Sequence, residues 1–217
     1  MSGKPSHPVF ARLYERTAPV MERAGMTRHR KELLAGLAGE VIEIGAGTGL
    51  NFGYYPAEVT RVLAVEPEPR MRQAISRAAA RAPVQVDPAD GVAERLPAPD
   101  ASFDAAVVCL VLCSVTDGAA ALSEIRRVLR PGGQLRFLEH VAAWTPGLRR
   151  VQRALDATVW PYFSGGCHLG HDTAKDMADA GFELSELRRI RFPDTRPMLP
   201  FAPHILGVAR SPGTEVA

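Results

Sequence analysis

Apolar residues recur along the chain with two spacings, one typical of helices and one typical of buried strands. Before residue 40, one helical face is outlined by residues three and four apart: Phe10, Leu13, Tyr14, Thr17 and Met21. Pro19 falls inside this pattern, and an internal proline predicts a kink in the helix. A second short helix is expected over 31–37, so the segment 1–39 is predicted to be an N-terminal helical cap.

Strands and helices alternate from residue 41 onward. Short apolar, β-branched runs predict strands at 41–44, 61–66, 84–86, 103–109 and 134–140, with helices near 69–80 and 119–129 between them. Strands joined through helices imply right-handed crossovers. The pattern therefore predicts an α/β fold built on a mostly parallel sheet.

The organisation changes after residue 140. A helical pattern at 145–160 leads into the glycine-rich stretch SGGCHLGHD, so 144–172 is expected to be an insertion outside the sheet and a candidate substrate cover. A helix over 173–180 is expected to end at Gly181, and strands are expected at 183–191 and 204–209. The main domain is thus predicted to span 40–212.

The composition is that of a folded globular chain. Of 217 residues, 46% are hydrophobic and 23% charged, which excludes a chain left disordered for lack of apolar surface. The net charge of +2 is dispersed in short patches, so nucleic acid is not expected as a partner. No apolar run approaches the roughly 20 residues of a membrane span, and no signal peptide is visible, so a cytoplasmic protein is expected. Three cysteines at spacings unlike a disulfide framework fit a reducing compartment.

Three alternating glycines, Gly45, Gly47 and Gly49, follow the first buried strand and permit a tight backbone turn against a ligand. Glu66 ends the next strand, where a carboxylate can accept hydrogen bonds from ribose hydroxyls. Glu43 precedes the first glycine and would repel a pyrophosphate. A nicotinamide dehydrogenase is therefore disfavoured, and a ligand that carries an ammonium group is favoured.

These motifs together resemble a known family. EIGAGTG at 43–49, Glu66, DASFDAAVV at 100–108 and LRPGG at 129–133 resemble the class I S-adenosylmethionine-dependent methyltransferases. Within them, LVLCSV at 110–115, FLEHV at 137–141, GGCHL at 165–169 and PHILG at 203–207 are similar to a methyltransferase-like group that includes mammalian thiol S-methyltransferases. The resemblance implies a Rossmann-like, seven-stranded, mostly parallel sheet with helices on both faces, an N-terminal helical lid, and S-adenosylmethionine as cofactor, released as S-adenosylhomocysteine.

The resemblance also implies roles for individual residues. The methionine part of the cofactor would lie along Gly45, Ala46, Gly47 and Gly49, with Glu43 and Asn51 near its ammonium group. Glu66 would bind the ribose, and Pro67 and Met71 would lie beside the adenosine. The adenine edge would meet Gly91, Ala93 and Glu94, where Val92 replaces the usual aspartate and Asp90 is a candidate substitute. Cys109 and Leu110 would border the reactive methyl group.

On the acceptor side, His140 is the first candidate for a catalytic group and His168 the second; a structural role is the alternative for each. Cys109, Cys113, Cys167 and the nearby histidines match no tetrahedral zinc spacing, so no metal is expected and buried cysteines are expected to act as small apolar residues.

The expected activity is methyl transfer to the sulfur of a small hydrophobic thiol, by a monomer or homodimer. The mammalian members carry an N-terminal hydrophobic segment that is not seen in this sequence, so the activity is expected in solution. Two alternatives keep the donor: O- or C-methylation of a quinone-like or phenolic compound, and N-methylation of a phospholipid. A third is a cofactor-binding protein without turnover.

Overall fold

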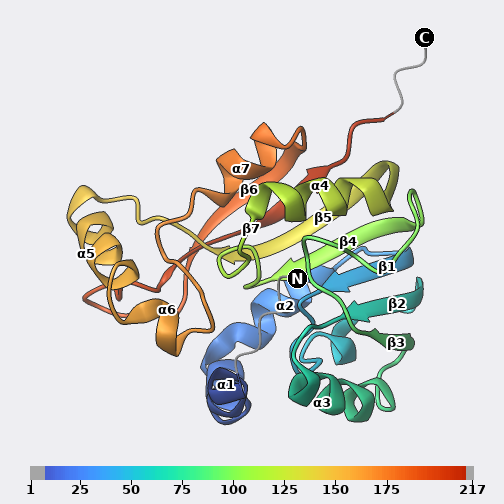
Figure 1. Cartoon of the computed structure of the whole chain (residues 1–217), viewed down its shortest axis with the longest axis horizontal. Coiled ribbons are helices and arrows are strands. Elements are labelled where there is room, and N and C mark those ends of the chain that lie inside the picture. The colour runs from blue at the N-terminus through green and yellow to red at the C-terminus, as the bar shows by residue number, and fades with distance from the viewer. Residues whose placement is uncertain (1–7, 214–217) are drawn as a thin grey trace, which may run out of the picture.

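A seven-stranded sheet runs through the computed structural model, which describes residues 8–213 (Figure 1). Its strands are β1 (Gly39–Ile44), β2 (Val59–Val65), β3 (Gln85–Ala89), β4 (Phe103–Cys109), β5 (Leu129–His140), β6 (Glu183–Arg191) and β7 (Pro203–Arg210). Their order across the sheet is β3-β2-β1-β4-β5-β7-β6. Strands β1 to β5 pair in parallel, and β7 runs antiparallel to β5 and β6. The expected seven-stranded, mostly parallel sheet is confirmed.

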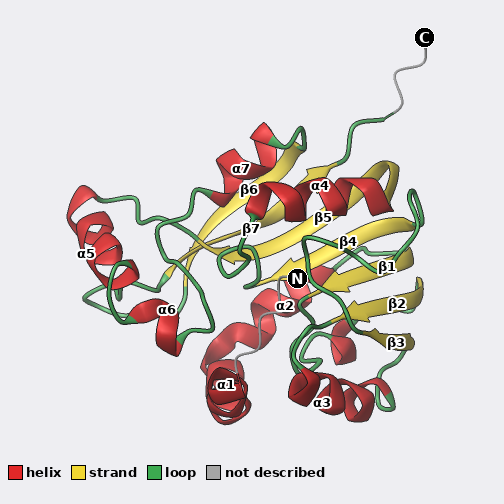
Figure 2. Cartoon of the chain, viewed as in Figure 1, coloured by secondary structure: helices red, strands yellow, loops and turns green. Residues whose placement is uncertain are grey.

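Helices cover both faces of this sheet (Figure 2). They are α1 (Pro8–Met21), the π-helical turn η1 (Glu22–Met26), α2 (Thr27–Leu34), the 3₁₀ turn η2 (Phe52–Tyr54), α3 (Pro69–Ala79), α4 (Gly118–Val128), α5 (Pro146–Asp156), α6 (Trp160–Phe163) and α7 (Thr173–Asp179). Helix α4 begins where its sequence supplies a cap, because the carboxylate of Asp117 accepts the backbone N–H of Ala120 at 3.0 Å.

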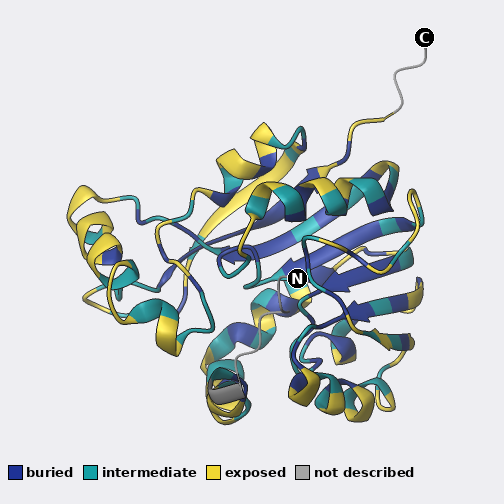
Figure 3. Ribbon diagram, in the orientation of Figure 1, coloured by how far each residue is buried: buried dark blue, intermediate teal, exposed yellow. Residues whose placement is uncertain are grey.

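Alternate residues of the strands enter two separate cores. Ile42 and Val108 pack with α4 and α7 on one face, whereas Val41 and Val107 pack with α2 and α3 on the other. Both sets are fully buried (Figure 3). A strand buried on both faces has a continuous apolar run in its sequence, which is why the central strands are recognisable without a structure.

Helices α5 and α6 stand outside the sheet, at the left of Figure 1. Exposed apolar side chains, among them Tyr162 and Phe163, lie on this part of the chain. Within residues 8–213, no helix has both the length and the apolar character that a membrane crossing requires.

Three local expectations are corrected. Helix α1 continues through Pro19, and the chain bends instead at Gly25. The φ of Gly25 is 118°, a backbone conformation that glycine adopts readily and other residues rarely adopt. Strand β3 is shifted toward residue 89 and contains Pro88, which an edge strand tolerates because one side of it needs no hydrogen bonds. Strand β5 begins at Leu129, whereas the strand was expected to begin at residue 134.

The register brings three chain segments to one edge of the sheet. Ile44, at the end of β1, pairs with Val65 of β2 and with Val108 of β4. The residues that follow these strands therefore lie side by side at the carboxyl edge, which is where open α/β sheets bind ligands.

Candidate active site

The turn after β1 is built from glycines in left-handed backbone conformations. Gly45, Gly47 and Gly49 have φ values of 65°, 58° and 80°. A Cβ atom on Gly45 would lie 2.6 Å from a methyl of Val111, so a side chain there would displace the loop after β4. The turn therefore needs glycine for both its backbone conformation and its packing.

Glu66 connects this turn to the end of β2. Its Oε2 accepts the backbone N–H of Gly47 at 2.8 Å, and its Oε1 accepts the backbone N–H of Glu68 at 2.9 Å. Burial raises the pKa of the Glu66 carboxyl, and the two backbone donors act against that rise. The carboxylate is thus held in one orientation at the wall of a cavity, with lone pairs left for a ligand.

The polar groups beneath the turn form a buried network. The Asn51 amide donates to Glu43 Oε1 at 2.9 Å, and the Tyr55 hydroxyl donates to Glu43 Oε2 at 2.7 Å. Glu43 and Asn51 were expected beside the ammonium group of the cofactor, but neither lines the cavity. They support the glycine turn from below, because their hydrogen-bonding groups are directed at each other and at Tyr55.

Arg30 completes this network and was not anticipated from the sequence. It lies on α2 with 4% of its surface exposed, donates to Asn51 Oδ1 at 3.0 Å and pairs with Glu22 at 2.8 Å. Its guanidinium also contacts Cys109 Sγ at 3.2 Å. One charged side chain on α2 thus joins this helix to the segment after the glycine turn and to the end of β4.

The network predicts a pH dependence of stability. Burial raises the pKa of Glu43 to about 7, above its ordinary value, so the folded chain holds this proton more tightly than the unfolded chain. That contribution to stability is fully present below the unfolded pKa and is lost as the pH rises through about 7. Between about pH 6 and about pH 8, wild type should lose about 1 kcal/mol more unfolding free energy than Glu43→Gln.

Denaturant unfolding at several pH values measures this difference. Both proteins share the other titrating groups, so only the difference between them reports Glu43. If the unfolding free energies of the two proteins change with pH in parallel, Glu43 titrates alike in the folded and unfolded chains.

A cavity of about 560 Å³ opens along the carboxyl edge of the sheet. This volume is in the range of small-molecule sites, about 300 to 1,000 Å³. Among the residues expected to bind a cofactor, those on its wall are Gly45, Gly47, Glu66, Pro67, Met71, Gly91, Ala93, Glu94, Cys109 and Leu110. Ala46 and Gly49 lie outside the wall, as do Glu43 and Asn51.

The loop after β3 differs in detail from its expected role. Glu94 lies on the wall, but its carboxylate also accepts the backbone N–H groups of Thr116 and Asp117, at 3.0 and 3.3 Å. Asp90 does not line the cavity and forms an ion pair with Arg72 at 3.0 Å. Asp90 is therefore not placed to substitute for an aspartate at position 92.

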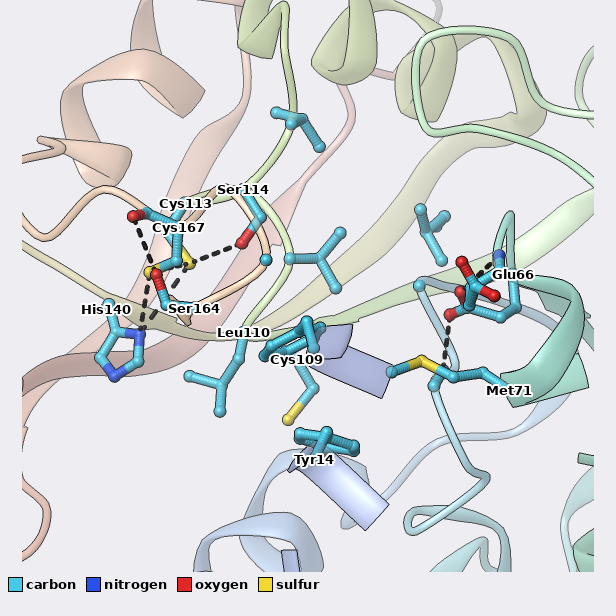
Figure 4. Close-up of a pocket in the computed structure, with 18 of the residues that line it drawn as sticks. Tyr14, Glu66, Met71, Cys109, Leu110, Cys113, Ser114, His140, Ser164 and Cys167 are labelled. Atoms are coloured by element: carbon cyan, nitrogen blue, oxygen red, sulfur yellow. Dashed lines mark hydrogen bonds between the residues drawn. The ribbon is translucent and has the colours of Figure 1, made fainter. Parts of the chain in front are cut away.

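The predicted apolar face of α1 forms the opposite wall. Its five residues, Phe10, Leu13, Tyr14, Thr17 and Met21, all line the cavity. Figure 4 shows Tyr14 beside Cys109, at the end of β4. Burial raises the pKa of Cys109 to about 11, so its thiol stays protonated at neutral pH. A mostly apolar wall of this kind suits a ligand with little charge.

The far end of the cavity holds His140 and two cysteines (Figure 4). His140 Nδ1 lies 3.6 Å from Cys167 Sγ and 3.9 Å from Cys113 Sγ, and the two sulfurs are 3.2 Å apart. The ring of His204 packs on His140 with 4.2 Å between centroids. Burial, and then the His204 ring, lower the pKa of His140 below its ordinary value, so its imidazole is neutral at neutral pH.

His168 does not reach this end of the cavity, contrary to expectation. It is exposed and its ring contacts His171. Its backbone N–H donates to the carbonyl of Cys113 at 2.8 Å, which turns Cys167 inward. The glycine-rich loop thus contributes its cysteine to the site and leaves its histidine at the surface.

Comparison with known proteins agrees with this geometry. Residues 42–137 match the family model described as a methyltransferase domain. Human thiol S-methyltransferase TMT1B is 36% identical over 184 residues, which cover 81% of this chain and 73% of that protein. The chain belongs to the S-adenosylmethionine-dependent methyltransferases. S-Adenosylmethionine is accordingly its cofactor, and a small molecule its substrate.

This methyltransferase is also similar to a second class of methyltransferase and to solved structures. A ubiquinone/menaquinone biosynthesis C-methyltransferase of Caulobacter vibrioides is 40% identical over 106 residues, which cover 49% of this chain and 39% of that enzyme. A solved S-adenosylmethionine-dependent methyltransferase of Thermotoga maritima superposes with a TM-score of 0.66 at 24% identity, covering 94% of this chain and 99% of that chain. The latter likeness supports the fold.

The cavity of this methyltransferase fits the cofactor. Gly47 lies on the wall with a positive φ and Glu66 beside it, so the backbone approaches a ligand closely next to a fixed carboxylate. Gly91 also lies on the wall, and a Cβ added there would lie 2.8 Å from Pro97. When bound, S-adenosylmethionine supplies a methyl group activated by a positively charged sulfur.

Proposed function

We propose that this methyltransferase transfers the methyl group of S-adenosylmethionine to the sulfur of a small, fairly apolar thiol. The observation that carries the proposal is the likeness to an enzyme named thiol S-methyltransferase across 81% of the chain. The cavity supports it, because the wall contributed by α1 is mostly apolar. A small apolar acceptor would be desolvated there without loss of strong hydration.

The proposed roles are assigned to residues that lie on the cavity wall. Gly45 and Gly47 contact the methionine part, Glu66 accepts hydrogen bonds from the ribose, and Pro67 and Met71 contact the adenosine. Gly91, Ala93 and Glu94 lie at the adenine edge, while Cys109 and Leu110 border the methyl group. Residues 8–39 act as a cap over this site, and His140 faces the acceptor; residues 1–7 of the predicted cap lie outside the described residues.

Positioning accounts for much of the rate in such a reaction. Methyl transfer is an in-line displacement, so the acceptor sulfur must approach the methyl group opposite the sulfur that leaves. Few thiols are ionised at neutral pH, and the thiolate is the reactive form. The groups around His140 therefore need to favour the thiolate as well as hold it.

The test uses three acceptors of one shape: a ring that carries a thiol, a hydroxyl or an amine. Purified protein with methyl-labelled donor should label the thiol and leave the phenol and the amine unlabelled. Labelling of the phenol alone would contradict the sulfur assignment and favour O-methylation. A quinone analogue in the same series tests C-methylation, for which the likeness to the Caulobacter enzyme over half of this chain is the reason.

His140→Ala should separate thiols by their acidity. Turnover is expected to fall about tenfold for an alkyl thiol, which is only a few per cent ionised at neutral pH, and little for an acidic thiol that is already ionised. Initial rates with an acidity series of similar-sized thiols measure this. An equal loss for every thiol would indicate that His140 has a purely structural role.

A further inference from the structure

Cys113, Cys167 and His140 bring three metal-ligating atoms to one point of the cavity wall, although they are far apart in sequence. Cys113 lies in the loop after β4, His140 ends β5, and Cys167 lies in the loop after α6. Their two Sγ atoms and a ring nitrogen all fall within 4.8 Å of one another. Among the described residues this is the one such group of histidine, cysteine and acidic side chains.

The backbone holds this cluster in place. The His168 N–H bonds the Cys113 carbonyl at 2.8 Å, so the loops that carry the two cysteines are joined beside the sulfurs. The buried carboxylate of Glu139 accepts the backbone N–H of Val111 at 2.9 Å, which ties the end of β5 to the loop after β4. The cysteines are 1% and 4% exposed. The three side chains are therefore preorganised with respect to one another.

The spacing is close to that of a tetrahedral zinc site. Zinc bonds of about 2.3 Å to sulfur and about 2.0 Å to nitrogen place two sulfurs about 3.8 Å apart and a sulfur and a nitrogen about 3.6 Å apart. Here the sulfur–nitrogen distances are 3.6 and 3.9 Å, and the sulfur–sulfur distance is 3.2 Å. Only the two sulfurs need to separate, by about half an ångström.

The position of the cluster points to a use for the fourth coordination place. A zinc ion held by three protein ligands keeps one place open, and all three ligands here line the cavity of the proposed acceptor. We propose that Cys113, Cys167 and His140 bind a zinc ion whose open place is taken by the sulfur of the acceptor thiol. This inference rests on the proposed function and specifies how the acceptor is held.

The chemistry balances with the groups named. The acceptor thiol loses its proton to solvent as its sulfur binds zinc. Its lone pair then forms the new bond to the methyl carbon while the bond from that carbon to the donor's positively charged sulfur breaks. The products are a neutral thioether and S-adenosylhomocysteine, and a neutral thioether is a weaker ligand than a thiolate. His140 acts as a ligand in this arrangement and need not accept a proton.

A disulfide between the two cysteines is the competing outcome. Their sulfurs are 3.2 Å apart, whereas a disulfide bond is about 2.05 Å long, so both are free thiols in this structure. A disulfide would remove two zinc ligands. Metal content is therefore measured on reduced protein, with the number of free thiols counted in the same sample.

The first experiment measures zinc in untagged, reduced full-length protein. We expect about one zinc per chain after equilibration with zinc and removal of the excess, as for three-ligand catalytic sites. Cys113→Ser and Cys167→Ser should each weaken zinc binding by at least about 100-fold. Cys109→Ser is the matched control: Cys109 lines the same cavity but lies outside the cluster, so this variant should keep its zinc. Reduced wild type that takes up no zinc would overturn the proposal.

The second experiment uses wild type alone, so it does not depend on the folding of a variant. Cobalt replaces zinc in such sites and reports its ligands by absorption. Adding an alkyl thiol should raise the sulfur-to-cobalt charge-transfer absorbance by about half, because two thiolate ligands become three. The alcohol of the same shape should leave the spectrum unchanged. If the absorption spectrum does not change when the thiol is added, the proposal that the acceptor sulfur binds the metal is overturned.

The two proposals fail in different ways. Rapid methylation of thiols by protein shown to be free of metal would overturn the zinc site and leave thiol methylation standing. Methylation of the phenol alone would overturn thiol methylation. The zinc measurement and the cobalt spectrum would remain valid for the cluster, but the inference that the metal serves a thiol substrate would fall.

Discussion

Replacing Glu66 by glutamine is expected to weaken binding of S-adenosylhomocysteine by about 5- to 150-fold, which corresponds to about 1 to 3 kcal/mol. The side chain keeps its size, but one of its two oxygens becomes an N–H₂ group that cannot accept a hydrogen bond. In the structure each oxygen already accepts a backbone N–H, from Gly47 and from Glu68, so the amide must lose one of these bonds as well as an acceptor for the ribose. Calorimetric titration with S-adenosylhomocysteine measures the change.

Glu183→Gln is a matched control for this experiment, because Glu183 is exposed on β6. It removes the same charge and should leave the affinity unaltered. Unfolding curves of both variants show whether either substitution lowers the stability of the protein as well as its affinity for the ligand. Wild-type affinity in a folded Glu66→Gln protein would remove Glu66 from the cofactor site.

The sheet was predictable because its physical cause is local. Central strands are buried on both faces, and each therefore forms a short continuous apolar run. The boundaries were less accurate where tertiary context decides them. Pro88 is accepted in β3 because that strand lies at the sheet edge, and Pro131 and Gly132 lie within β5 although the pair is typical of a turn. Neither the edge position of β3 nor the early start of β5 can be predicted from the residues next to these prolines.

The cofactor side of the site was also local in sequence. Gly45 and Gly47 follow β1 directly and Glu66 follows β2 directly, and parallel pairing of these two strands brings the three residues together. The pattern did not separate residues on the cavity wall from those beneath it. Glu43 belongs to a buried network, because Asn51 and Tyr55 fold under the turn and donate hydrogen bonds to its carboxylate.

The acceptor side could not be predicted in the same way. The spacing rules for zinc sites describe ligands carried in pairs on one short loop, whereas Cys113, His140 and Cys167 each come from a different segment. Their proximity depends on β4 pairing with β5 and on the loop after α6 folding back onto Cys113. One signal was available: Cys113 lies shortly after β4 and His140 ends β5, so both were predictable near the sheet's carboxyl edge.

Arg30 is the clearest case of a residue that only the structure reveals, and its replacement should have the largest effect on stability. Arg30→Met is expected to cost about 3 to 5 kcal/mol, because removing one partner of a buried ion pair leaves the other charge uncompensated. Glu22 would lose its 2.8 Å partner while only 16% of its side chain is exposed, and Asn51 would lose the donor to its Oδ1. Denaturant unfolding at neutral pH measures the loss.

Arg28→Met is the matched control, since Arg28 lies on the same helix with 76% of its side chain exposed and pairs with Glu32 at the surface. Its ion pair should be worth less than about 1 kcal/mol.

The double variant Arg30→Met/Glu22→Gln separates charge from packing. If the cost arises from the uncompensated carboxylate of Glu22, the second change should recover a large part of it. If it arises from the lost bonds to Asn51 and the contact with Cys109, the second change should recover little. In that case S-adenosylhomocysteine should also bind more weakly to the single variant, because Asn51 holds Glu43 beneath the glycine turn. Arg30 would then couple the helical cap to the cofactor site.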